Sequence, residues 1–112
     1  MGTDETDRPS RIAALNDRLR RTGEGGQIAL TRGVQALGEK MIARIMSAVQ
    51  EFDQFSPDND PHQEHDFGSV YISIAVNWKI DYYDPSLTHG SEDPTDQSKT
   101  CRVLTIMLRE EY

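Results

Sequence analysis

The sequence predicts an α+β fold, in which a small antiparallel sheet of about four strands carries two helices packed on one face. Residues Val70 to Tyr82 alternate strictly, with apolar side chains at every even position, which is typical of a β-strand with one buried face. Residues 34–52 instead follow the helical period. The apolar positions of that helix are Leu37, Met41, Ile42, Ile45, Met46, Val49 and Phe52. The predicted order of elements is α-β-α-β-β-β, an antiparallel sheet with its helices segregated to one face, which is typical of the α+β class.

The N-terminal part predicts a tail, a helix and a short strand. Residues 1–9 are polar, and we expect them to be a disordered tail in front of a single domain that spans 10–112. Ser10 suits the N-cap of a helix over residues 11–21, and Gly23 would end that helix. Residues 27–32 then predict a strand.

The alternating stretch is long for one strand. Thirteen extended residues would reach about 43 Å, which is more than a chain of this size comfortably holds. We therefore favour two strands, at 67–73 and 75–83, joined by a three-residue turn or a bulge near Ser73–Ala75; one bent strand is the alternative. The loops 53–66 and 84–100 are polar, and the second is unusually long. The last strand, 101–109, is apolar on both sides, which indicates a central position in the sheet.

Composition excludes several classes of protein. No stretch approaches the roughly 20 apolar residues of a membrane span, and the N-terminus lacks the apolar segment of a secretory signal. Cys101 is the single cysteine, so an internal disulfide is excluded, and a reducing, cytoplasmic setting is the natural expectation.

Charge is distributed unevenly along the chain. Residues 1–49 hold six acidic and eight basic side chains, a balance of +2, whereas residues 50–112 hold thirteen acidic and four basic, a balance of −9. Direct nucleic-acid binding by the second part would place carboxylates against phosphates, so we do not expect it. A gathered acidic surface could instead imitate a phosphate row and bind a basic groove on another protein. The predicted partner-binding residues are Asp53, Asp58, Asp60, Glu64, Asp66, Asp81, Asp84, Glu92, Asp93 and Asp96.

Candidate chemistry elsewhere is weaker. His62 and His65 are three residues apart among carboxylates, which suits zinc or a similar ion, but a loop gives them no helical registration. A solvated loop is the favoured interpretation, and a metal-dependent enzyme that uses both histidines is kept as an alternative. Asp81 beside Lys79 is interpreted as a cross-strand ion pair rather than an acid–base catalyst. We predict no catalytic residue and no cofactor.

Five segments carry a family resemblance: residues 12–20, 31–34, 64–68, 78–84 and 102–112. Together they resemble one uncharacterised family, the domain-of-unknown-function family 3768. The family occurs in small proteins of plasmids and other mobile elements, so the resemblance implies an accessory or counter-defence role. The leading hypothesis is therefore a non-enzymatic inhibitor, of the anti-CRISPR or anti-restriction kind, that docks a nucleic-acid-mimicking acidic face on a host nuclease or effector. A subunit that forms homodimers or larger assemblies, through a sheet edge or the first helix, is a further alternative.

Overall fold

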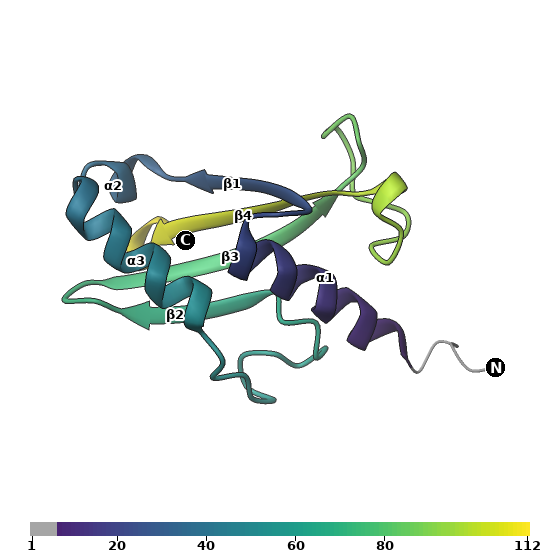
Figure 1. The fold of residues 1–112 in the computed structure, drawn as a ribbon, viewed down its shortest axis with the longest axis horizontal. Helices are drawn as coiled ribbons and strands as arrows, with labels where there is room; N and C mark the ends of the chain where they lie inside the picture. The colour runs from purple at the N-terminus through teal and green to yellow at the C-terminus, as the bar shows by residue number, and fades with distance from the viewer. Residues whose placement is uncertain (1–6) are drawn as a thin grey trace.

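A computed structural model describes residues 7–112 as a four-stranded sheet with helices beside it (Figure 1). The helices are α1 (Arg8–Thr22), α2 (Arg32–Gln35) and α3 (Glu39–Glu51). The strands are β1 (Gly26–Leu30), β2 (Phe67–Tyr71), β3 (Ala75–Tyr83) and β4 (Cys101–Leu108). Two 3₁₀ turns complete the set, η2 (Gln97–Lys99) and η3 (Arg109–Glu111). The α+β class is confirmed.

The sheet is mixed rather than antiparallel. Its order is β1-β4-β3-β2, so β4 is central, as its two apolar faces predicted. β2 pairs with β3 and β3 with β4 in antiparallel directions, but β1 runs parallel to β4, with Ile28 opposite Leu104. The antiparallel prediction was therefore wrong for this pair. Side-chain alternation reports which face of a strand is buried and carries no information about the direction of its neighbour.

The alternating stretch forms a hairpin. β2 and β3 are joined by residues 72–74, where the Ile72 N–H donates to the Ile74 carbonyl at 3.0 Å and Ser73 has φ 62. The two-strand prediction is thus confirmed, and the single bent strand is wrong. Because the loop has three residues, the side-chain parity on either side of it is kept.

Both helices predicted from the sequence differ from the observed ones. The helix expected over 34–52 is two helices, because Gly38 adopts φ 90, a conformation that interrupts the helical path between α2 and α3. The first helix begins at Arg8, so Ser10 lies inside it and is not its N-cap; Pro9 stands in its first turn, where proline is tolerated. The predicted tail is therefore wrong for residues 8 and 9, and its residues 1–6 lie outside the described part.

One face of the sheet carries the core. Even-numbered residues of β3 and β4 are buried with apolar residues of the helices, and Figure 1 shows α1 and α3 on the same side of the sheet. The fully buried members include Leu19, Ile45, Val49, Val76, Trp78, Leu104 and Ile106. Gly68 packs directly against the Trp78 indole, since a Cβ at position 68 would lie 2.6 Å from its Nε1. This packing holds β2 in place, and with it the end of the acidic loop 53–66 that precedes β2.

Candidate functional site

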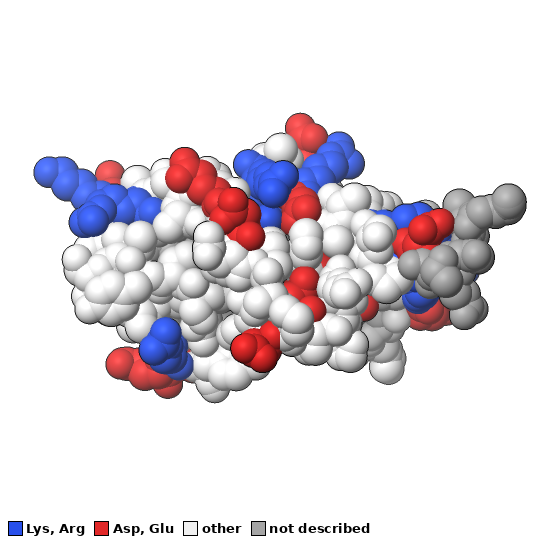
Figure 2. Space-filling model, turned by 90° about the horizontal axis from the view of Figure 1, so that it is seen from below, with Lys and Arg blue, Asp and Glu red and all other residues white. Residues whose placement is uncertain are grey.

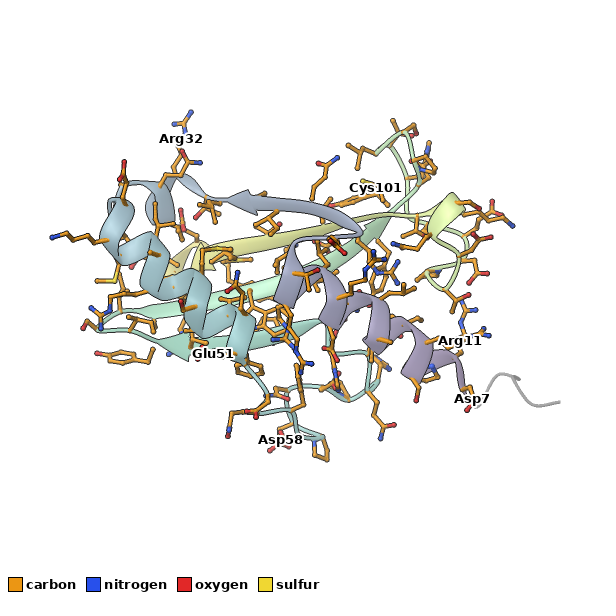
Figure 3. The ribbon with its side chains drawn as sticks, viewed as in Figure 1. Asp7, Arg11, Arg32, Glu51, Asp58 and Cys101 are labelled. Atoms are coloured by element: carbon orange, nitrogen blue, oxygen red, sulfur yellow. The ribbon has the colours of Figure 1, made fainter. Side chains whose placement is uncertain are left out.

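The two acidic loops leave the sheet at the same end. Residues 53–66 lead into β2 at Phe67, which is opposite Lys79 in β3. Residues 84–100 connect the end of β3 to the start of β4, where Tyr83 is opposite Cys101. We call residues 53–66 and 84–100 together the loop end. Figure 3 shows Asp58 in the first loop, below the sheet, and Asp7 and Arg11 further to the right, at the start of α1.

A buried asparagine connects α1 to loop 53–66 and to strands β3 and β4. The Asn16 side chain is fully buried; its Nδ2 donates to the Glu64 carbonyl at 3.0 Å and to the Tyr82 hydroxyl at 2.8 Å. The Tyr82 hydroxyl donates in turn to the Glu64 carboxylate at 2.8 Å, and burial raises the pKa of the Tyr82 phenol. The asparagine Oδ1 accepts from Arg102 Nε at 2.8 Å. One side chain therefore joins the helix, the first loop, β3 and β4.

Arg102 extends this network to the second loop. Its guanidinium is fully buried, donates to Gln97 Oε1 and the Pro94 carbonyl, and lies 5.2 Å from the centre of the Tyr82 ring. Burial lowers the pKa of Arg102. Since its hydrogen bonds go to uncharged groups, it fastens loop 84–100 to the strand without cancelling that loop's carboxylates.

A second buried arginine fastens loop 53–66. Arg20 donates to the carbonyls of Val49, at 2.9 Å, and Phe52, at 2.9 Å, which satisfies the end of α3. Its other nitrogen donates to Asp17 at 3.0 Å, and Asp17 also contacts His65 Nδ1 at 3.0 Å. The Asp17 carboxylate therefore connects the end of α3, through Arg20, to loop 53–66, through His65.

The carboxylates of loop 84–100 are ordered by their own loop. Three aspartates accept hydrogen bonds of 2.6 to 2.8 Å from a hydroxyl two residues further on, and these bonds lower the pKa of each carboxyl. The pairs are Asp84 with Ser86, Asp93 with Thr95, and Asp96 with Ser98. Two ion pairs offset part of the charge: Arg8 with Asp93 at 3.1 Å and Lys99 with Glu92 at 3.5 Å.

Several carboxylates of loop 53–66 point inward instead. Asp60 is only 5% exposed and accepts from the backbone N–H groups of Glu64, at 3.0 Å, and His65, at 3.1 Å. The Glu64 carboxylate is engaged by Tyr82, as described above. Asp66 is half-buried, and its burial raises the pKa of its carboxyl. The exposed carboxylates of this loop are Asp53 and Asp58.

The predicted acidic set is therefore divided. Asp53, Asp58 and Glu92 are exposed, whereas Asp60 and Glu64 serve the interior of the loop end. Asp81 forms an ion pair with Lys79 at 2.9 Å, but both residues belong to β3, so the pair lies along one strand and the predicted cross-strand pairing was wrong. Figure 2 shows, on the face seen from below, that acidic side chains stand in separate groups with basic side chains among them.

The histidines are not brought together with a metal-binding set. No group of three or more His, Cys, Asp or Glu side chains in residues 7–112 is arranged to hold a metal ion. His62 is exposed, while the His65 ring stacks on Phe55 with centroids 4.0 Å apart. Both nitrogens of that ring face carboxylates, since Nε2 lies 3.9 Å from Asp60. The open cleft of about 560 Å³ beside it is lined by residues of α1 and of loop 53–66.

Sequence reasoning missed the buried polar residues, although a signal for them exists. Asn16 and Arg20 lie four and eight positions after Ile12, on the buried stripe of α1. Arg102 lies two and four positions before Leu104 and Ile106, on the buried face of β4. A polar residue in phase with an apolar stripe indicates a buried hydrogen-bond network, and this rule would have found all three.

A comparison with known families gives one match. The family described as "Protein of unknown function (DUF3768)" matches residues 30–111, which is more than half of the chain. The chain belongs to this family. The matched range begins at the end of β1 and includes both acidic loops and the remaining strands. No match was found among curated proteins or among solved structures.

Proposed function

We propose that this member of the family is a non-enzymatic binding protein that docks its loop end on a basic, nucleic-acid-handling protein. The observation that supports the proposal is that both acidic loops leave the sheet at one end. Residues 53–66 hold five acidic side chains and no lysine or arginine, a balance of −5; residues 84–100 hold four acidic side chains and one lysine, a balance of −3. Such a concentration of charge favours association with a basic surface.

The internal hydrogen bonds of the loop end support the same proposal. Carboxylates that are already ordered lose little conformational freedom on binding, so docking on them costs less. The hydroxyl bonds to Asp84, Asp93 and Asp96 lower the pKa of those carboxyls and keep them charged well below neutral pH. Because the acidic side chains form separate groups, the partner would meet discrete carboxylate clusters with Asp58 in one and Glu92 in the other.

The proposal also includes a specific biological role for this binding. The family resemblance to proteins of plasmids and mobile elements favours a counter-defence inhibitor, of the anti-restriction or anti-CRISPR kind, that acts in the cytoplasm on a nuclease or effector. The described helices include none that is long and apolar enough to cross a membrane. In this proposal the acidic groups compete with nucleic acid for the partner's basic groove.

The proposal is tested by titrating the purified protein against a panel of restriction endonucleases and CRISPR effectors, at several salt concentrations. We expect at least one of them to be bound and its cleavage of DNA to be inhibited, with an affinity that falls as salt rises. Absence of binding across the panel, or binding with no salt dependence, would contradict the proposal.

A pair of variants with equal net charge locates the surface. D58N/E92Q removes one exposed carboxylate from each loop, whereas E39Q/E110Q removes two exposed carboxylates beyond the opposite end of the sheet. Both variants change the net charge from −7 to −5. We expect D58N/E92Q to weaken binding by about tenfold at low salt and E39Q/E110Q to leave it nearly unchanged. Equal effects would mean that total charge, not the loop end, determines binding.

A further inference from the structure

The open cleft between α1 and loop 53–66 combines an apolar wall with acidic groups. Its volume is about 560 Å³, and Figure 1 shows this loop below α1. The titratable side chains that line it are Asp17, Asp60 and His65, and no lysine or arginine of the described residues does so. Such a lining suits a ligand with an alkyl stem and a positive charge. The apolar wall consists of Ala13, Ala14, Phe55, Pro57 and Pro61.

The Asp60 carboxylate is anchored through one oxygen and free at the other. Asp60 is 5% exposed, and its Oδ1 accepts from the backbone N–H groups of Glu64, at 3.0 Å, and His65, at 3.1 Å. Its Oδ2 accepts no hydrogen bond from residues 7–112 and lies 3.9 Å from His65 Nε2. Because Asp60 lines the cleft, this oxygen is available to a donor that enters it. A buried charge without a counter-ion is costly, so a cation in the cleft would be stabilised there.

His65 supplies a second acceptor beside this oxygen. Its Nδ1 lies 3.0 and 3.1 Å from the two Asp17 oxygens, so in the neutral ring the proton is on Nδ1 and Nε2 is an acceptor. The ring is held in this orientation by stacking on Phe55, with centroids 4.0 Å apart. Asp17 is itself paired with Arg20 at 3.0 Å. Asp60 therefore carries the negative charge of the cleft that no arginine or lysine of the described residues offsets.

We propose that this cleft binds an arginine side chain of the basic partner, an inference that rests on the proposed function. The guanidinium donates to Asp60 Oδ2 and His65 Nε2, and its alkyl stem packs on the apolar wall. Arginine suits the cleft better than lysine, because a guanidinium presents several N–H donors in one plane to two acceptors that are 3.9 Å apart. It also suits the cleft better than a metal ion, because residues 7–112 bring no three ligands together.

The test uses a small arginine compound, so it does not require the partner. Nα-acetyl-arginine methylamide carries the guanidinium as its only charge, and its citrulline counterpart has nearly the same shape without charge. We expect titration with the arginine compound, followed by NMR, to shift the backbone amide signals of Ala13, Gln63 and His65 to saturation. The citrulline compound should bind about tenfold more weakly, because it forms no charge-assisted hydrogen bond with Asp60.

A pair of variants locates the binding at the free oxygen. Asp60→Asn keeps an oxygen that accepts from the N–H groups of Glu64 and His65, and replaces the free oxygen with an amide donor. Glu51→Gln also removes one negative charge, at an exposed position at the end of α3 that does not line the cleft. We expect D60N to unfold in urea as the wild type does, and to bind the arginine compound about tenfold less tightly. E51Q should bind it as the wild type does.

The outcomes separate this inference from the proposed function. Absence of saturable shifts at the cleft, equal binding of the citrulline compound, equal binding by D60N, or shifts caused by zinc chloride and not by the arginine compound would overturn the inference. A nuclease or effector that binds wild type and D60N equally would leave the loop end as the docking surface and overturn the role of the cleft. Binding of the arginine compound at the cleft, with no protein of the panel bound, would confirm the cleft and contradict the proposed function.

Discussion

The two acidic loops use the same side chain in opposite ways. In loop 84–100, Asp84 and Asp96 accept hydrogen bonds from serines and backbone groups of their own loop, so their charges order a surface segment. In loop 53–66, the Asp60 carboxylate is buried against backbone N–H groups, and Glu64 accepts from Tyr82 of the neighbouring strand. Loop 84–100 is therefore ordered by bonds within its own surface segment, whereas loop 53–66 is anchored to the interior.

This difference shows that a count of acidic residues does not measure an acidic surface. A carboxylate contributes to long-range attraction when it is exposed, but a buried one mainly satisfies donors that would otherwise be unpaired. Loop 53–66 carries five carboxylates, of which Asp53 and Asp58 are exposed; loop 84–100 carries four, of which Glu92 is exposed and the other three are partly buried. Variants that separate anchoring from surface charge therefore test the comparison directly.

The largest effect is expected where α1 holds the loop end. Asn16→Ala removes the bonds to Glu64, Tyr82 and Arg102, and leaves the buried Arg102 Nε without its partner. We expect a loss of about 3 kcal/mol in the free energy of unfolding, measured by urea denaturation.

Asn59→Ala is the matched control for this variant. Asn59 accepts from the Ser56 N–H and donates to the Gln54 carbonyl, both within its own loop. Its loss should cost about 1 kcal/mol or less. If the two asparagine variants are equally stable, Asn16 does not anchor the loop end.

A smaller loss of stability is expected when a carboxylate is removed, and it should be larger for an inward-facing carboxylate than for an outward-facing one. Asp60→Ala leaves two backbone N–H groups near the interior without their acceptor, and we expect a loss of about 2 kcal/mol in the free energy of unfolding. Asp96→Ala removes the cap of the short turn η2, which is open to water, so the loss should be smaller. Urea denaturation of both variants measures the difference, and a larger loss for Asp96→Ala would reverse the comparison drawn above.

The smallest effect concerns pH and Asp66. Burial raises the pKa of this carboxyl above its ordinary value of 3.8, so the folded chain holds the proton where the unfolded chain has lost it. Its contribution to stability is therefore present at low pH and is lost as the pH rises from about 3.8 through the raised folded pKa. Asp66→Asn should raise the melting temperature at pH 7 slightly, by the equivalent of less than about 1 kcal/mol, and leave it unchanged at pH 3. A variant that is less stable than wild type at pH 7 would contradict this sign.

The sequence predicted the hairpin and the central position of β4, but it did not predict the direction of β1 or the break between α2 and α3. Alternation in residues 67–83 and the two apolar faces of residues 101–109 are local signals, so the hairpin and the central position of β4 could be predicted from them. The direction of β1 and the break at Gly38 depend on tertiary packing and on one backbone angle, which local periodicity does not report.

The site was harder to predict than the fold, for a physical reason. Whether an acidic side chain of a loop faces water or the interior depends on which donors the folded chain brings beside it. The contacts of Asp60 are local, but those of Glu64 come from Asn16 and Tyr82, which are 48 and 18 residues away. Asn16, Arg20 and Arg102 could have been found from their phase with apolar stripes; their partners could not.

The most direct test of the proposed function is the salt dependence of partner binding by the two variants of equal charge. Affinity for an inhibited nuclease or effector is measured by titration for wild type, D58N/E92Q and E39Q/E110Q at several salt concentrations. Docking through the loop end predicts that log affinity falls less steeply with log salt for D58N/E92Q, while E39Q/E110Q keeps the wild-type slope. Identical slopes for all three proteins would show that the exposed carboxylates of the two loops do not form the docking surface.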